Sequence, residues 1–363
     1  MTSERSAEID AFLSASGWSG ARRSPLPGDA STRRYERISL GDRQAMLMDA
    51  PRGNEDAPCP PGASEAERLA LGWNATSRLA ASRVEAFAAV GAHLRGLGFS
   101  APEVLAVDPA RGLAIVEDLG ELLFARAIPE GANEIVLYEA AALLLARLHA
   151  APMPDRLPGP DGDWPLLPFD GLALSANADL FVDWLPRLEP SAAISGADRA
   201  RWDQVRAGLV AEALSFPRTF TLRDYHAENL LWLPGRKGVA RVGLLDFQDA
   251  VQGFRAWDFA MLLQDARRDV SPRASEAAII AYLDAMGASE AAFRREFAVL
   301  GAINAMRILG IFSRLIARDG KTRYRQFMAR EWGHLAASLA HPATSELAAF
   351  LRETGAAPER FAA

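Results

Sequence analysis

A short island of strand-like sequence interrupts the helical second part of the chain, and this order of elements restricts the fold more than any other feature. From about residue 120 onward, apolar residues recur with the spacing of amphipathic helices. The predicted helices cover 133–150, 173–188, 197–215 and the chain from 255 to its end. The island consists of three short apolar runs, at 220–222, 230–233 and 241–246.

The first part of the chain is predicted to contain a small sheet. Two apolar-rich runs, 35–40 and 43–49, flank Gly41-Asp42, a pattern typical of a β-hairpin. Two further strands are predicted at 103–107 and 113–117, around a turn. Outside the strands we expect a helix over 4–16 capped by Ser3, a proline-rich loop over 51–64, and a helix over 65–97 that breaks near Gly72.

Composition excludes several classes of protein. The chain has 363 residues, half of them hydrophobic, which is enough for a buried core and for two domains or lobes. Its net charge of −6 argues against nucleic acid as a partner. No apolar run is long enough to predict a membrane span, and the polar N-terminus does not resemble a signal peptide. A single cysteine, Cys59, rules out an internal disulfide. We therefore expect a cytoplasmic enzyme acting on small molecules.

The strand-like island carries the residues that point to chemistry, within LRDYHAENLLWL at 222–233 and VGLLDFQDA at 242–250. Asp224 and Asn229 lie in a tight loop before one apolar strand, and Asp246 ends the next. A carboxylate and an amide oxygen at adjacent strand ends suit Mg²⁺, and a second carboxylate can orient a hydroxyl nucleophile. Phosphoryl transfer requires both a metal on the nucleotide phosphates and a carboxylate that faces the acceptor hydroxyl. The alternative is that Asp224 and Asn229 are ordinary turn formers.

Asp-x-x-x-x-Asn followed by a strand ending in Asp-Phe resembles the catalytic and metal loops of the protein-kinase-like fold. The segments DYHAENLLW, LLDFQDA and WDFA resemble the aminoglycoside phosphotransferase and choline kinase family. Within it, GDASTRRYERI, MLMDAP and ILGIFSRLIARDGKTRY are similar to the bacterial anomeric kinases for N-acetylmuramate and N-acetylglucosamine. This resemblance covers residues 10–340. It implies an α+β, two-lobe fold, with a small antiparallel sheet in a nucleotide-binding N-lobe (1–119) and a larger, mainly helical C-lobe (120–363).

The resemblance also implies roles for individual residues. Asp224 matches the catalytic aspartate, Asn229 and Asp246 match the magnesium ligands, and Asp258 matches an aspartate with a structural role. Backbone groups at Glu117 and Leu119 are expected to bind the adenine of ATP. The expected phosphate-binding loop comprises Gly28, Asp29, Ala30, Ser31, Thr32 and Arg33.

Two positions depart from the family pattern. The strand at 44–49 contains no lysine to pair with the nucleotide phosphates, and Leu222 stands where many relatives place histidine. Arg33 and Arg34 are the nearest cations that can replace the lysine. They can equally be solvated strand residues.

The acceptor site is expected in the C-lobe, facing Asp224. Residues 301–332 contain seven basic and two acidic side chains, which suits a neutral or anionic acceptor, such as a sugar with a lactyl carboxylate, better than a polycationic aminoglycoside. A solvated helix face would have the same composition. The candidate acceptor contacts are Arg223, His226, Asp249, Arg307 and Lys321.

Three functions are consistent with these observations. The first is an ATP- and Mg²⁺-dependent kinase that phosphorylates the anomeric hydroxyl of amino sugars in peptidoglycan recycling. The second is a kinase of the same fold for another alcohol, such as an aminoglycoside, choline or homoserine. The third, a catalytically silent kinase-like protein, is suggested by the missing lysine alone, and retention of Asp224, Asn229 and Asp246 argues against it.

Overall fold

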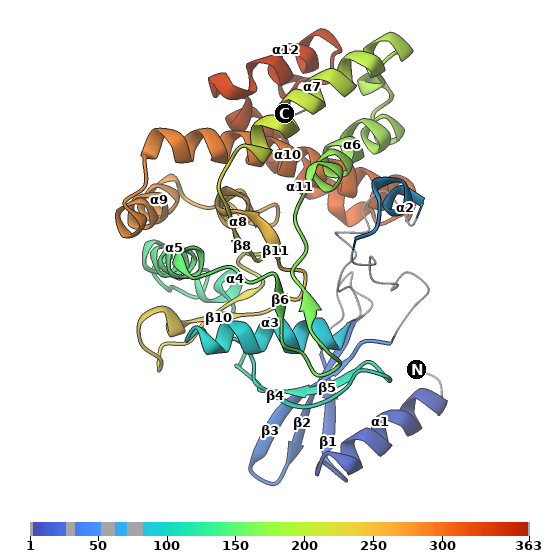
Figure 1. The fold of residues 1–363 in the computed structure, drawn as a ribbon, viewed down its shortest axis with the longest axis vertical. Helices are drawn as coiled ribbons and strands as arrows, with labels where there is room; N and C mark the ends of the chain where they lie inside the picture. The colour runs from blue at the N-terminus through green and yellow to red at the C-terminus, as the bar shows by residue number, and fades with distance from the viewer. Residues whose placement is uncertain (1–2, 27–32, 52–61, 71–82, 362–363) are drawn as a thin grey trace.

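The computed structural model describes residues 3–26, 33–51, 62–70 and 83–361. Its N-terminal part is a five-stranded antiparallel sheet in the order β1-β2-β3-β5-β4 (Figure 1). The strands are β1 (Arg22–Pro25), β2 (Arg34–Leu40), β3 (Arg43–Asp49), β4 (Val104–Asp108) and β5 (Leu113–Val116). Helix α1 (Ser3–Ala15) covers one face, and α3 (Val84–Gly96) lies between the sheet and the rest of the molecule (Figure 1).

The sheet separates two apolar cores because successive side chains of a strand point to opposite faces. On β3, Ala45 and Leu47 pack with Ile9 and Phe12 of α1. Met48, on the same strand, joins the main core. The hairpin predicted at Gly41-Asp42 is confirmed, since Leu40 pairs with Arg43 and Gly41 has φ +59°. That left-handed conformation favours glycine in a two-residue loop.

The rest of the chain is mainly helical. Its long helices are α5 (Glu134–Ala150), α6 (Gly171–Leu188), α7 (Gly196–Leu214), α8 (Arg255–Leu263), α9 (Pro272–Met286), α10 (Glu290–Ala317), α11 (Arg325–Leu339) and α12 (Ser345–Glu353). Helix α10 packs against α6, α8 and α11, and α5 packs against α9. By length and composition α10 could cross a membrane, but 78% of its most apolar window is buried inside the molecule. It is therefore a core helix.

The strand-like island forms two separate two-stranded ribbons. Strand β8 (Arg218–Thr221) pairs with β11 (Val251–Phe254), and β9 (Leu230–Trp232) pairs with β10 (Val242–Leu244). The β9–β10 ribbon adjoins the chain that leaves the sheet, because the Leu244 N–H donates to the Ser100 carbonyl and the Trp232 N–H donates to the Leu122 carbonyl. The predicted catalytic segment thus lies next to the connection between the two parts of the molecule.

The helix expected over 65–97, with a break near Gly72, is seen as α2 (Glu65–Ala70) and α3, and the position of the break lies outside the described residues, within 71–82. Several other predictions of local structure were wrong. Ser3 is the first residue of α1 rather than its cap. The strand expected over 241–246 ends at Leu244, since Asp246 has φ +55° and cannot continue a strand. Strands β1, β11, β6 (Arg156–Leu157) and β7 (Trp164–Pro165) were not predicted.

Helices α6 and α10 cross closely at Gly310. We therefore expect one added methyl group at this position to lower the stability of the protein substantially. A Cβ on Gly310 of α10 would lie 2.3 Å from the Leu180 carbonyl carbon, so Gly310→Ala must displace backbone. We expect it to lower the free energy of unfolding by about 1–3 kcal/mol or more, measured by urea denaturation. Gly333→Ala, in α11, is the control. It meets no atom within 4 Å and should stabilise by about 1 kcal/mol. Equal effects of the two substitutions would contradict this packing.

Candidate active site

A buried carboxylate holds the loop that carries Asp224. Asp258, in the first turn of α8, is fully buried, and its two oxygens accept hydrogen bonds from the backbone N–H groups of Leu222 and Arg223, each at 2.8 Å. Arg223 has φ +73°, so the chain reverses sharply there. These hydrogen bonds offset the cost of that conformation and orient the next residue, Asp224. The geometry agrees with the structural role expected for Asp258.

Asn229 connects the two ends of this loop. Its Nδ2 donates to the Asp224 carbonyl at 2.9 Å and lies 3.2 Å from Nε2 of His226. Its own carbonyl accepts the N–H of Leu245, at 2.9 Å, which links the loop to the segment that follows β10. Asn229 Oδ1 has no hydrogen-bond partner within the described residues. The amide therefore presents a free oxygen to the site.

Asp246 follows β10 by two residues, and one of its oxygens is already bound by protein groups. Oδ1 forms an ion pair with Arg33 and accepts a hydrogen bond from Gln248 Nε2 at 2.9 Å. In the described part of the chain, Oδ2 has no hydrogen-bond partner. Burial by itself would raise the pKa of the Asp246 carboxyl, but Arg33, Gln248 and His226 together hold it below its ordinary value. The group is ionised at neutral pH.

These two oxygens fit a magnesium ion that is shared with a bound phosphate. Asp246 Oδ2 and Asn229 Oδ1 are hard donors of the kind Mg²⁺ prefers. No group of three His, Cys, Asp or Glu side chains among the described residues is placed to hold a metal by itself. A magnesium ion here would complete its coordination with water and phosphate oxygens.

Arg33 is the cation that the sheet contributes to this site. It lies immediately before β2, and its ion pair with Asp246 joins residues 213 positions apart in sequence. Arg34, the next residue, is exposed. The other residues of the expected phosphate loop, 28–32, lie outside the described residues. Of the two arginines considered as replacements for the missing lysine, the structure brings Arg33 to the predicted metal ligand.

Glu117 and Leu119 lie where the sheet meets the helical part. The Glu117 carboxylate pairs with Arg236 at 2.7 Å and with Arg95 at 3.3 Å, and its N–H donates to the Glu103 carbonyl. Neither the Glu117 carbonyl nor the Leu119 N–H has a protein partner among the described residues. These two backbone groups can accept from and donate to an adenine edge.

Arg307 and Asp224 face each other across the helical side of the site. Arg307 Nη2 lies 3.8 Å from Asp224 Oδ1, and Nη1 donates to Asn304 Oδ1 at 3.0 Å. Its guanidinium lies over the ring of Trp257, 5.9 Å from the centroid. Burial lowers the pKa of Arg307, although Asp224 acts in the opposite direction. A long, flexible cation is thus fixed in place beside the predicted catalytic carboxylate.

The remaining acceptor candidates separate into two groups. Arg223 and Asp249 lie at the site: the Arg223 guanidinium stacks on Phe169, and burial raises the pKa of Asp249 while Arg223 partly offsets that effect. Lys321 is exposed in the turn beyond α10, whose end lies about 15 Å along the helix axis from Arg307. The structure does not bring Lys321 to Asp224.

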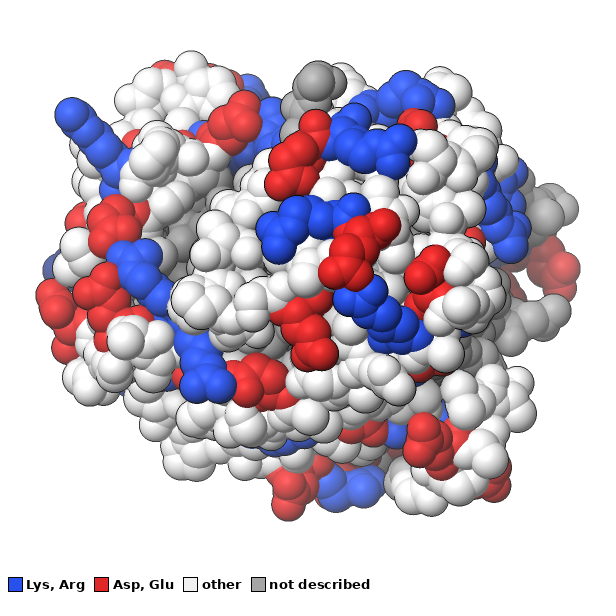
Figure 2. Space-filling model, turned by 90° about the horizontal axis from the view of Figure 1, so that it is seen from above, with Lys and Arg blue, Asp and Glu red and all other residues white. Residues whose placement is uncertain are grey.

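The basic stretch at 301–332 is not one basic pocket. Arg318 pairs with Asp319 at 2.6 Å, Arg330 with Asp269 at 2.6 Å, and Arg325 lies 3.8 Å from Glu189. Acidic and basic side chains are likewise interspersed on the face shown in Figure 2. The excess of basic residues in 301–332 suggested an anionic acceptor. Of that stretch, Arg307 is the residue that the structure shows beside Asp224.

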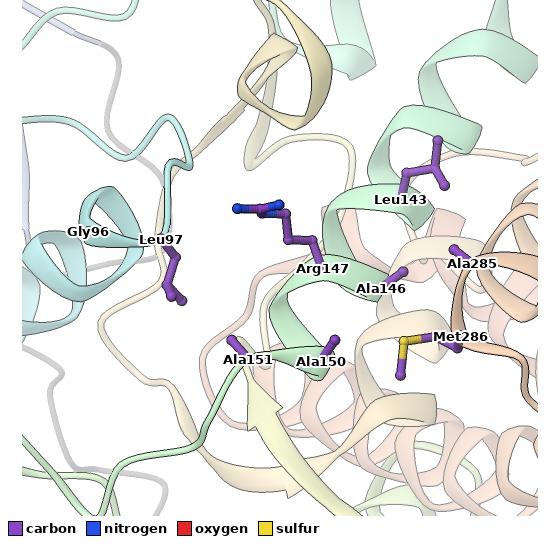
Figure 3. Close-up of a pocket in the computed structure, with 9 residues that line it drawn as sticks. All are labelled: Gly96, Leu97, Leu143, Ala146, Arg147, Ala150, Ala151, Ala285 and Met286. Carbon is purple, nitrogen blue, oxygen red and sulfur yellow. The ribbon is translucent and has the colours of Figure 1, made fainter.

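A hollow of about 550 Å³ lies away from the predicted site residues, between the C-terminal ends of α3, α5 and α9 (Figure 3). Its walls are mostly apolar, with Leu97, Leu143 and Met286 among them, and Arg147 points into it (Figure 3). No residue that lines it was predicted to act in catalysis or binding.

Two contributors to the site were missed from the sequence. Gln248, which donates to Asp246, stands two residues after it in the same motif, so its position was a usable signal. Trp257, which underlies Arg307, gave no such signal, because its proximity results from the packing of α8 against α10.

Sequence comparison identifies close relatives. Residues 22–297 match the model of the phosphotransferase enzyme family. The N-acetylmuramate/N-acetylglucosamine kinase of Caulobacter vibrioides is 50% identical over 351 residues, 96% of each chain. The enzyme of the same name from Pseudomonas aeruginosa is 30% identical, over 93% of this chain and 90% of that one.

Solved structures confirm the fold. A choline/ethanolamine kinase family protein from Mesorhizobium loti has a TM-score of 0.57 at 18% identity, covering 96% of this chain and 99% of that one. An ADP-bound aminoglycoside phosphotransferase, APH(2'')-Ib, has a TM-score of 0.55 at 12% identity, over 93% and 99% of the two chains. The predicted α+β, protein-kinase-like two-lobe fold is confirmed, and the chain belongs to the phosphotransferase enzyme family.

Proposed function

We propose that this chain is an ATP- and Mg²⁺-dependent kinase that phosphorylates the anomeric hydroxyl of N-acetylmuramate and N-acetylglucosamine, in peptidoglycan recycling. The observation that carries the proposal is the near-full-length similarity to kinases named for these two sugars. Asp224, Asn229 and Asp246, gathered in one site, support it. We place the reaction in the cytoplasm, where ATP is available.

Asp224 orients the acceptor hydroxyl and takes up its proton as the oxygen bonds to the γ-phosphorus of ATP and the bond from that phosphorus to the departing ADP breaks. An anomeric hydroxyl is more acidic than an ordinary alcohol, which makes transfer of its proton to a carboxylate easier. Asn229 Oδ1 and Asp246 Oδ2 hold the metal, which when bound neutralises charge on the nucleotide phosphates. The hydrogen bonds from Leu222 and Arg223 to Asp258 keep Asp224 in position during this step.

The nucleotide lies between the two lobes in this scheme, with the boundary after residue 119. The Glu117 carbonyl and the Leu119 N–H bind the adenine edge, and their lack of protein partners within the described chain supports that role. Arg33 binds the phosphates in place of the absent lysine, supported by its position on Asp246.

The acceptor lies against α10. Arg307 faces the lactyl carboxylate of N-acetylmuramate, which is supported by its buried guanidinium 3.8 Å from Asp224. A fixed cation at this position repels a polycationic aminoglycoside and is compatible with neutral N-acetylglucosamine. The alternative is a kinase that acts on another neutral or anionic alcohol. The test of acceptors in the next paragraph distinguishes the two functions.

The position of the transferred phosphate tests the proposed function. Incubation with MgATP and either sugar should yield a product whose ³¹P NMR signal is coupled to the anomeric proton. Methyl glycosides, in which that oxygen is blocked, should not react. A 6-phosphate product, or no turnover of either sugar, would move the protein to another acceptor class.

Replacing the proposed catalytic aspartate should separate chemistry from binding. Asp224→Asn keeps the size and hydrogen-bonding capacity of the side chain but removes its basicity. We expect kcat to fall by roughly 10²–10⁴ while the affinity for MgATP, measured by calorimetry, stays within about threefold. Full turnover by this variant would contradict the role of Asp224.

The two neighbouring arginines provide a matched test of phosphate binding. Arg33→Met should raise the KM for ATP by about 10- to 100-fold, the size expected for a lost charged hydrogen bond. Arg34→Met removes the same charge from an exposed side chain one residue away and should change KM less than about threefold. Equal effects of the two variants would mean that Arg33 has no special role.

A further inference from the structure

A buried carboxyl group on α11, the helix packed against α10, has no part in the catalytic scheme above. Glu331 projects from α11, which packs along α10, and it is 0% exposed. Among the described residues, neither of its carboxyl oxygens has a hydrogen-bond partner and no ion pair joins it to a cation. Arg307 acts on it electrostatically across the interface of the two helices.

The charged groups around Glu331 are mostly engaged elsewhere. Asp265, just beyond α8, is 3% exposed and adds a second acid, with one oxygen bound to the Arg267 N–H at 2.9 Å and the other unpartnered. The two nearby arginines pair with other acids, Arg330 with Asp269 at 2.6 Å and Arg267 with Glu228 at 3.0 Å. Arg307, which also lies 3.8 Å from Asp224 and donates to Asn304, is the cation with the largest effect on Glu331.

A carboxylate that is removed from water, has no hydrogen bond and adjoins a second acid is stabilised by a proton. Burial raises the pKa of Glu331 well above its ordinary value, Asp265 raises it further, and Arg307 offsets only part of the effect. His334, one turn along α11, does not supply a charge at neutral pH, because burial lowers its pKa. At neutral pH, Glu331 is therefore an uncharged acid.

We propose that Glu331 is a positioning residue that determines the preference for anionic over neutral acceptors. As an uncharged acid it leaves the guanidinium of Arg307 available to the acceptor's carboxylate. As a carboxylate it attracts the guanidinium and cancels its charge. This inference rests on the proposed function, since it requires that two sugars differing by a carboxylate are both substrates.

The wild-type enzyme alone provides the first test. As pH rises, Glu331 loses its proton, whereas the lactyl carboxylate of N-acetylmuramate is already ionised. The ratio of kcat/KM for N-acetylmuramate to that for N-acetylglucosamine should fall by about tenfold as the pH is raised from neutrality into the alkaline range. Any ionisation that affects both sugars equally cancels in this ratio.

Three variants assign the effect to Glu331. Glu331→Gln has the shape of the protonated acid, so the ratio should stay at its neutral-pH value throughout. Arg307→Gln should give a low ratio at every pH, because the cation through which Glu331 acts is gone. Glu290→Gln removes a negative charge from an exposed position at the start of α10 and should retain the wild-type fall.

The possible failures are distinguishable. If the wild type phosphorylates both sugars with parallel pH profiles, or if Glu331→Gln keeps the pH-dependent ratio, the role of Glu331 is overturned and the kinase assignment stands. If the wild type phosphorylates neither sugar, the proposed function itself is overturned. The pH dependence of the kcat/KM ratio in the wild-type enzyme tests the role of Glu331 even if Glu331→Gln does not fold.

Discussion

The carboxylate of Asp258 is the interaction on which the site depends. It satisfies two backbone N–H groups at a chain reversal that contains a left-handed arginine, and without it that reversal would leave buried donors unpaired. Asp258 projects from α8, and α8 packs on α10. One buried acid therefore links the position of Asp224 to the helix that presents Arg307.

Ion pairs connect the two lobes in addition to apolar packing. Arg33 reaches from the sheet to Asp246, and Arg236 reaches from the helical part to Glu117 beside Ser100. Both pairs involve a residue with a proposed role in binding the nucleotide. The planar guanidinium suits these positions, because it holds several hydrogen bonds in a fixed geometry where lysine offers a mobile point charge.

Local sequence signals predicted much of this molecule, and the failures have a common cause. The hairpin at Gly41-Asp42 and the helices of the C-lobe follow from periodicity and turn chemistry, and the phosphotransferase motifs predicted site roles for Asp224, Asn229 and Asp246, which remain proposals. The exposed strand β1 has no apolar alternation, so nothing marked it. Arg307 and Lys321 look equivalent in sequence, yet one is buried against Asp224 and the other is exposed, a difference that arises only when α10 packs. The same packing buries Glu331, which sequence alone places on a charged helix.

Helix α10 has both a packing role in the core and a proposed role in acceptor binding, which many enzymes divide between different elements. It is a central helix of the core, with a glycine at a close crossing that leaves no room for a methyl group, and it also carries Arg307, the side chain proposed to face the acceptor. Most substitutions near Arg307 therefore disturb packing as well as recognition, so a change of acceptor through α10 carries a penalty in stability. We therefore expect acceptor preference in this scaffold to be changed with less loss of stability by substitutions on the elements around Arg307 than by substitutions in α10 itself.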